Sequence, residues 1–329
     1  MMRTGKVFTV AIVVAAIVIS FWIGRSSAQE AYPTKAIDII VPRSPGGSND
    51  LGARAMTAWL SKKWGVSVNV VNKPGGNTLP AVLEVYKARP DGYTLLADSQ
   101  SSSSLLGAVI KDLPIKVLDR TFIAGTANSP GVVLVGANSP YKNLDDLAAD
   151  AKKDPANFTW ASLGGVGGTD LLTRLFFRAV GVDVMKTKPV MTKGGGDAAI
   201  LVAGGNVKMT MASSGSAQPY LQPGAPARVL CVLAEKRMSY MPSIPSAKEL
   251  GWPQLIDTFW IGVSGPLKLS PQVLDAWSKT IKEMSSDKDY LDSLNKLGFN
   301  PQYRTGKELQ ALVSEEMQAL AEIYGTTKK

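Results

Sequence analysis

The chain has 329 residues, of which 45% are hydrophobic and 19% charged, so it can bury a substantial core and fits two lobes better than one. Its formal net charge of +9 comes from basic residues spread along the sequence, without the dense runs or interleaved aromatic residues of a nucleic-acid groove. Histidine is absent and cysteine occurs once, at Cys231 in an apolar run, which excludes Ser-His and Cys-His nucleophilic pairs, the commonest zinc sites and an intramolecular disulfide.

The first 28 residues have the pattern of an export signal. Two basic residues precede an apolar run over residues 7–23, and the small side chains of residues 26–28 follow as a cleavage site. A run of about 17 apolar residues is also borderline for spanning a bilayer, so an uncleaved membrane anchor is the alternative. In either case we expect the folded part of the chain outside the cytoplasm.

The folded part opens with a strand, a glycine-rich turn and a helix. IDIIV (residues 37–41) predicts the strand, PRSPGGSND (residues 42–50) the turn, and the pattern from Leu51 the helix. A strand that runs through glycines into a helix directs free backbone N–H groups and the positive end of the helix dipole to one point. We interpret this turn as a pocket for a carboxylate.

Two further strands also end in polar turns. SVNVVN (residues 67–72) leads into KPGGNT (residues 73–78), and the strand in DGYTLLADSQSSSS (residues 91–104) ends in an amide and a run of hydroxyls. Strands that alternate with helices are typical of a parallel α/β sheet, in which ligands bind beyond the carboxyl ends of the strands. The three turns are therefore expected to form one site.

The next segment predicts a crossing between two lobes. TFIAGTANSPGVVLVG (residues 121–136) reads as two apolar strands, with the crossing near residues 128–132. A helix is predicted over residues 144–153, with Asn143 as its N-cap.

The second lobe repeats the pattern of the first. A strand at residues 158–161 leads through SLGGVGGTD (residues 162–170) into a helix, and a strand at residues 188–191 leads through TKGGGD (residues 192–197) into another. The first of these loops does not match the dinucleotide fingerprint. We expect it to contact a ligand, the alternative being a tight turn that only lets the helix pack. The ASSGS segment at residues 212–216 is a further candidate to line the cleft.

Seven motifs carry a resemblance to a known family. Along residues 32–324 they are VPRSPGGSNDLGARA, VVNKPGGN, ARPDGYTLL, SPYKNLDDL, SLGGVGGTDLL, KGGGDAAILVAGGNV and MPSIPSAKELG. Their order and spacing resemble the tripartite tricarboxylate transporter substrate-binding family, also called the Bug family. Each motif is weak alone, whereas seven in register are a strong signal.

The resemblance implies an α/β, two-lobed periplasmic binding protein fold (type II) with the ligand cleft between the lobes. After a signal peptide at residues 1–28, it implies lobe 1 over residues 29–130, lobe 2 over residues 131–240 and a return to lobe 1 over residues 241–329. Such a protein captures a small-molecule carboxylate and delivers it to membrane permease subunits of the tripartite transporter. We expect a monomer without catalytic residues, metal or cofactor, and no binding of nucleic acid.

The resemblance also implies which residues bind the carboxylate, through backbone N–H groups, hydroxyls and ordered waters. Carried over by matching motif, they are Ser44, Gly47, Ser48, Asn49, Asn77, Ser99, Gln100, Ser162, Gly165, Gly167, Thr169, Gly195, Gly196 and Asp197. Asp197 has capping of its helix as an alternative role.

Several positions depart from the family pattern or invite a specific hypothesis. Arg43 stands where many relatives have Phe or Ala, so it either adds a cation beside the pocket or points outward. Lys208 replaces a common acid, on the surface or a strand edge of the second lobe, and Asp197 replaces a longer Glu. Trp160, directly before a glycine loop, is a candidate aromatic wall, whereas the other tryptophans are expected to pack in the core.

Two other functions remain open from the sequence alone. An extracytoplasmic enzyme needs a positioned acid, base or metal cluster, and the scattered Asp residues show no such spacing. Two S-x-x-K matches, at Ser139 and Ser285, lack the companion motifs of penicillin-binding enzymes. A ligand sensor that signals to a membrane partner would share its whole fold with a transport receptor, so the sequence does not separate those two.

Overall fold

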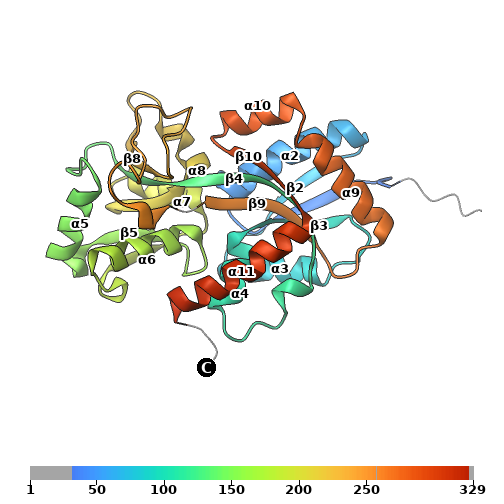
Figure 1. Ribbon diagram of the computed structural model, residues 1–329, viewed down its shortest axis with the longest axis horizontal. Helices are drawn as coiled ribbons and strands as arrows, with labels where there is room; N and C mark the ends of the chain where they lie inside the picture. The colour runs from blue at the N-terminus through green and yellow to red at the C-terminus, as the bar shows by residue number, and fades with distance from the viewer. Residues whose placement is uncertain (1–31, 257, 326–329) are drawn as a thin grey trace, which may run out of the picture. The chain divides into compact units, whose positions relative to one another are not determined.

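The computed structural model describes residues 32–256 and 258–325, so the expected export signal lies outside the described residues. Residues 35–329 form one compact unit. Within the two described ranges, no helix has the length and apolar character that crossing a membrane requires. Figure 1 shows the compact unit as two α/β lobes connected by long strands.

The first lobe is built on parallel strands. β1 (Ile37–Val41) pairs in parallel with both β2 (Val68–Asn72) and β3 (Thr94–Ser99), and β9 (Thr258–Gly265) pairs antiparallel with β3. The carboxyl ends of β1, β2 and β3 therefore meet at one edge, as the sequence predicts. The helices of this lobe are α2 (Ser48–Trp64), α3 (Leu79–Tyr86), α4 (Ser104–Val109), α9 (Pro271–Met284), α10 (Lys288–Lys296) and α11 (Gly306–Tyr324).

The second lobe has its own parallel strands. β5 (Thr159–Ser162) pairs in parallel with β6 (Lys188–Met191) and with β7 (Met209–Ser213). The helices of this lobe are α5 (Leu144–Lys153), α6 (Gly168–Val180), α7 (Gly195–Ala203) and α8 (Ser214–Ala217). The predicted N-cap of α5 is confirmed, because Asn143 Oδ1 accepts the backbone N–H of Asp146 at 3.0 Å.

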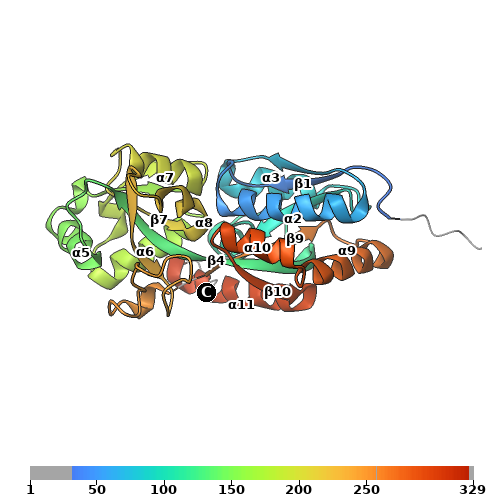
Figure 2. The same cartoon turned by 90° about the horizontal axis from the view of Figure 1, so that it is seen from above.

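One strand belongs to both lobes. β4 (Thr121–Gly136) pairs with β9 up to Pro130 and with β7 and β8 (Ala227–Leu233) from Gly131 onward, so its partners change inside the range expected for the crossing. The sequence predicts two strands here, and this is wrong, because 16 residues form a single continuous strand that Figure 2 shows passing from lobe to lobe. The strand order is β2-β1-β3-β9-β4-β7-β5-β6.

The C-terminal segment packs on the first lobe. β10 (Asn300–Thr305) pairs antiparallel with β4 over residues that also pair with β9. α10 and α9 contact α2, and α11 contacts α4.

An apolar seam joins the two lobes. Val166 and Leu171, from the loop and the first turn of α6, are 0% and 3% exposed and belong to the same buried cluster as Leu105, Leu106 and Leu320 of the first lobe. The lobes are therefore in direct apolar contact, in a closed arrangement. Cys231 is fully buried on β8, and burial raises its pKa to about 12.

Candidate functional site

A cavity of about 50 Å³ lies between the lobes, with room for roughly three to five water molecules. Its wall is formed by Arg43, Gly47, Ser48, Asn49, Ser99, Ser101, Leu163, Gly168, Thr169, Gly195, Ser213, Ser216, Phe259, Trp260 and Ile261. Arg43 is the one ionisable side chain among the described residues that line it.

Three helices begin at this cavity without a capping side chain. The N-caps of α2, α6 and α7 are Gly47, Gly167 and Gly194, all in extended backbone, and glycine has no side chain that could cap the first N–H groups of these helices. Uncapped helix N-termini bind anions through their free N–H groups and the positive end of the helix dipole. Because α2 comes from one lobe and α6 and α7 from the other, an anion in the cavity would interact with both lobes.

Asp50 stabilises the turn after β1 through hydrogen bonds. Its Oδ2 accepts the backbone N–H of Gly46 and Arg54 Nε, both at 3.0 Å, and its Oδ1 accepts Asn72 Nδ2 at 2.9 Å. Burial raises the pKa of Asp50, but these hydrogen bonds, with the charge of Arg54, outweigh it and lower the pKa below the ordinary value. Gly46 has φ of +80°, which favours glycine. The turn is thus fixed by a carboxylate that does not line the cavity.

Asp170 stabilises the second-lobe loop before α6 in the same way. It is 1% exposed and accepts hydrogen bonds from Ser162 Oγ at 2.5 Å and from the backbone N–H of Leu163 at 2.8 Å. Burial raises its pKa, although bonds from Ser162, Leu163 and Gly165 and the charge of Arg43 act in the opposite direction. The donors of Ser162 and Gly165 are therefore used inside the loop, and neither residue lines the cavity.

Serine hydroxyls connect the lobes at another side of the cavity. Ser48 Oγ, on α2, donates to Ser213 Oγ at the end of β7, which lies 2.9 Å from Ser216 Oγ. Both second-lobe serines line the cavity, in agreement with the expectation for residues 212–216.

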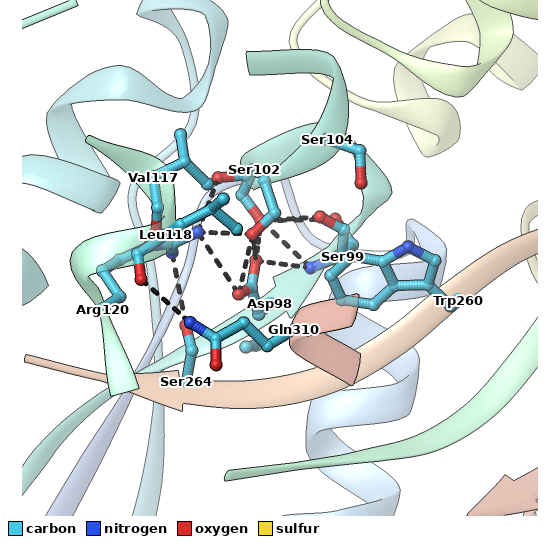
Figure 3. Close-up of polar contacts among 12 residues, drawn as sticks. Asp98, Ser99, Ser102, Ser104, Val117, Leu118, Arg120, Trp260, Ser264 and Gln310 are labelled. Carbon is cyan, nitrogen blue, oxygen red and sulfur yellow. Dashed lines mark hydrogen bonds and ion pairs between the residues drawn. The ribbon is translucent and has the colours of Figure 1, made fainter. Parts of the chain in front are cut away.

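The end of β3 is held by a buried ion pair. Arg120 and Asp98 have fully buried side chains, with Nη2 of Arg120 3.4 Å from Oδ2 of Asp98. Asp98 Oδ1 also accepts the backbone N–H of Ser99 at 2.8 Å and Ser102 Oγ at 2.7 Å, and Figure 3 shows these groups pointing toward one another. Burial lowers the pKa of Arg120, which the charge of Asp98 opposes. The network places Ser99, the N-cap of the short 3₁₀ helix Gln100–Ser102, in the cavity wall.

Glu316 on α11 positions an aromatic part of the wall. It accepts Trp260 Nε1 at 2.9 Å, a hydroxyl from Ser104 and a weak bond from Gln100 Nε2 at 3.4 Å. Burial raises the pKa of Glu316, and those three hydrogen bonds partly counteract this. Gln100 thus points to Glu316, whereas the indole of Trp260 lies in the wall.

Arg43 is buried, so the alternative of an outward-facing side chain is wrong. It is 6% exposed and donates from Nη2 to the backbone carbonyl of Val166 on the second lobe at 2.5 Å. Burial lowers its pKa to about 10, against the charge of Asp170, so it remains a cation at neutral pH.

The fourteen residues carried over from the family fall into two groups. Those that line the cavity are Gly47, Ser48, Asn49, Ser99, Thr169 and Gly195. Those that do not are Ser44, Asn77, Gln100, Ser162, Gly165, Gly167, Gly196 and Asp197. Ser44 and Asp197 bond to each other across the lobes, and Gly196 packs so closely that a Cβ would lie 3.0 Å from the carbonyl of Pro45. That these residues bind a ligand stays a prediction.

Two further hypotheses concern Trp160 and Lys208. Trp160 is 3% exposed, donates from Nε1 to Thr187 Oγ1 at 2.8 Å and packs on Phe177, so it belongs to the core and does not line the central cavity. Lys208 forms an ion pair with Asp150 at 2.7 Å and also lies outside the wall. Neither residue therefore acts directly on a ligand in the cavity.

Sequence reasoning missed the contribution of β9. Phe259, Trp260 and Ile261 complete the wall, and Phe259 lies so close to the start of α6 that a Cβ on Gly168 would be 1.1 Å from its ring. An apolar strand carries no polar signal that would distinguish a cavity wall from a core.

Comparison with known proteins shows which family and which folds the chain resembles. The chain matches the family described as tripartite tricarboxylate transporter family receptor over residues 53–326. It is 28% identical over 301 residues to Protein BugT of Bordetella pertussis, with 91% of each chain covered. The structure of MatC from Rhodopseudomonas palustris with bound malate matches with a TM-score of 0.83 and 24% identity, over 89% of this chain and 100% of that chain.

A second solved structure, a Rhodopseudomonas palustris protein with adipate, has a TM-score of 0.83 and 24% identity, over 90% of this chain and 99% of that chain. These likenesses confirm the two-lobed periplasmic binding protein fold, and the family match confirms the resemblance carried by the seven motifs.

Proposed function

Since this chain belongs to the family of tripartite tricarboxylate transporter receptors, we propose that it is an extracytoplasmic receptor that captures a small organic acid between its lobes. In this proposal it delivers the acid, unchanged, to the membrane permease subunits of a tripartite transporter. The observation that carries the proposal is the convergence of the uncapped N-termini of α2, α6 and α7 on one cavity between the lobes.

A carboxylate is the anion that suits this cavity. Each charge-assisted hydrogen bond from a helix N-terminus contributes about 1.5–3 kcal/mol when water is excluded. Hydroxyls of Ser48, Ser99 and Thr169 lie in the same wall. The malate and adipate bound in the two structurally similar proteins support the choice of an organic acid.

Capture requires the lobes to open, because the cavity between them is small. Contacts that hold them together near the cavity include Arg43 to Val166, Ser44 to Asp197 and Ser48 to Ser213. β4 passes between the lobes, and its change of partners at Pro130 and Gly131 is a natural hinge. Hinged closure around a ligand is the usual mechanism of periplasmic binding proteins.

The wall supports binding without turnover. Its described residues include no Asp, Glu, His, Cys or Lys, so no general acid or base is positioned in the cavity. Among the described residues, no group of three or more His, Cys, Asp or Glu side chains could hold a metal ion.

The test is a thermal-shift screen of the chain without residues 1–28 against mono-, di- and tricarboxylates, aromatic acids and amino acids. A ligand at about 100 times its dissociation constant should stabilise the fold by roughly 2.7 kcal/mol. The acid recovered after denaturation should be chemically unchanged. No shift with any acid, in protein shown to be ligand-free, would contradict capture, and a changed product would indicate an enzyme.

Delivery needs a separate test in cells. Uptake of the acid found in the screen should require both this protein and the permease subunits. Unimpaired uptake after deletion of the protein, with a lost transcriptional response to the acid, would instead favour a sensor.

A further inference from the structure

Two methionines of the second lobe are exposed beside a pocket. Met185 and Met191 are 79% and 64% exposed. Both line a pocket of about 300 Å³ between β6 and α6, together with the apolar side chains of Trp160, Val184 and Pro189. Single exposed hydrophobic residues are common, whereas two methionines at one pocket indicate a place for an apolar side chain of another molecule.

Exposed lysines surround the two methionines. Lys186, Lys188 and Lys193 each lie within three residues of a methionine, and none of them is ion-paired with a described residue. By contrast, Lys208 and Arg237 of the same lobe each have a carboxylate partner. The name methionine–lysine surface is used below for Met185, Lys186, Lys188, Met191 and Lys193.

The chain around this surface carries an excess of positive charge. Residues 171–196 include five basic residues and a single acid, Asp183, whose carboxylate accepts the backbone N–H of Met185 at 3.0 Å. Asp170, the acid in the pocket wall, is 1% exposed and accepts hydrogen bonds within its own loop. The surface is therefore complementary to a partner that carries negative charge.

The edge strand β6 restricts how a partner can bind. β6 is the last strand in the order of the sheet. Pro189 has no N–H, and the backbone N–H groups of Lys188 and Thr192 already donate to the carbonyls of Phe158 and Ser162, at 3.0 and 2.8 Å. Such an edge does not favour the addition of a further strand. We therefore expect binding through side chains, with an apolar one in the pocket and acidic ones at the lysines.

The methionine–lysine surface adjoins the cleft. Met191 and Lys193 also line a second pocket of about 300 Å³, to which Arg43 and Asn77 of the first lobe contribute. Arg43 belongs to the wall of the central cavity as well. A partner at this end of the surface would contact both lobes, so its affinity would depend on how the lobes are arranged.

We propose that the methionine–lysine surface binds an acidic segment of a membrane permease subunit, with one large apolar side chain of that segment in the pocket between Met185 and Met191. This inference rests on the proposed function, which supplies the permease as the partner. A second copy of this chain is a poorer match, because a symmetric dimer through this surface would place its lysines against one another.

The first test is photo-crosslinking in cells that contain the permease subunits and take up the acid found by screening. p-Benzoylphenylalanine in place of Met185 should crosslink to a permease subunit on irradiation, whereas the same residue in place of Leu267 should not. Leu267 is 44% exposed, follows β9 on the first lobe and lines neither of the two pockets.

Paired substitutions separate docking from ligand binding. Met185→Gln/Lys186→Glu should lower uptake about 10-fold or more, since it removes an apolar contact and reverses a charge. Calorimetry should give this variant an affinity for the acid within about 2-fold of the unmodified protein, because neither residue lines the central cavity. Leu267→Gln/Lys268→Glu makes the same kinds of change at another exposed pair and should leave uptake unchanged. Equal abundance and retained melting temperatures show that both variants are folded.

Each contrary outcome has a distinct meaning. Normal uptake by Met185→Gln/Lys186→Glu, in cells where deletion of the protein abolishes uptake, would overturn the inference and leave the proposed function intact. A loss of uptake matched by an equal loss of affinity for the acid would overturn it too, because the residues would then act on the ligand.

Two further results would assign the surface to another occupant and overturn the inference. They are a crosslink from position 185 to a second copy of the chain, and binding to phosphatidylglycerol vesicles that Met185→Gln/Lys186→Glu abolishes. If deletion of the protein leaves uptake unimpaired, the proposed function itself fails and the inference with it.

Discussion

Ser44 of the first lobe donates a hydrogen bond from Oγ to Oδ2 of Asp197 on the second lobe, over 2.9 Å. The same oxygen accepts the backbone N–H of Lys193 at 3.2 Å, so Asp197 holds the turn before α7 and also connects the lobes. This bond can exist only when the lobes are closed. It therefore adds to the stability of the closed state over the open one.

Loss of this bond should weaken ligand binding without unfolding the protein. We expect Ser44→Ala or Asp197→Ala to reduce affinity about 2- to 10-fold, since a net hydrogen bond contributes about 0.5–1.5 kcal/mol. Calorimetry measures the affinity, and small-angle scattering without ligand should show a larger radius of gyration. Ser285→Ala, which removes a surface hydroxyl bonded to the carbonyl of Lys282, is the matched control.

A double-mutant cycle decides whether the two residues act together. In the double variant the loss should be clearly smaller than the sum of the two single losses. Purely additive losses would mean that the bond does not contribute to closure.

Gly168 has no room for a side chain, whereas Gly47 does. A Cβ at Gly168 would lie 1.1 Å from the ring of Phe259, but at Gly47 the nearest heavy atom would be 3.6 Å away. Gly168→Ala should therefore destabilise the fold by about 1–3 kcal/mol through overpacking. Gly47→Ala should cost less than about 1 kcal/mol, as an N-cap change. Urea unfolding compares the two, and equal losses would contradict the packing at Phe259.

Loss of the Asp98–Arg120 ion pair should lower the free energy of unfolding. Arg120→Met leaves a buried carboxylate without its cation and should cost about 3–5 kcal/mol. Adding Asp98→Asn to that variant removes the unpaired charge and should recover part of the loss. Arg237→Met, at an ion pair whose two side chains are 45% exposed, should cost at most about 1 kcal/mol. Chemical denaturation measures all three, and a double variant less stable than Arg120→Met alone would argue against the charge as the cause.

Local patterns account for what the sequence predicts correctly. The α5 helix and its Asn143 cap, and the turns after β1, β2 and β3, depend on residues adjacent in the chain. Parallel pairing then brings the turns to one edge, because the carboxyl ends of parallel strands coincide.

Long-range contacts account for what the sequence does not predict. Ser162 and Gly165 look like free donors in the sequence, but the buried Asp170 accepts from both. Trp260 packs in the core as expected, but its bond to Glu316, 56 residues later, and its place in the cavity wall are not visible in the sequence. Which partner satisfies a polar group depends on tertiary packing, and neither periodicity nor spacing contains that information.

Glu316 should make stability depend on pH in a specific direction. Burial raises its pKa above the ordinary value of 4.5, so the folded state keeps a proton that the unfolded state has already released. The stability that this group contributes is therefore greatest below pH 4.5 and falls as the pH rises toward its raised pKa. Asp170, whose pKa burial also raises, acts in the same direction and is unchanged in the variants below.

Glu316→Gln removes this titration. Its amide oxygen can still accept from Trp260 and Ser104, and its NH₂ group can donate to Gln100 Oε1, a buried atom without a partner among the described residues. We expect a flatter profile of melting temperature above pH 4.5 and, at neutral pH, stability equal to the unmodified protein or about 1 kcal/mol higher. Glu315→Gln, the same charge change at the exposed neighbouring residue, should keep the original slope. If both variants keep that slope, Glu316 does not carry the raised pKa, and the polar cluster that positions Trp260 is solvated more than its burial indicates.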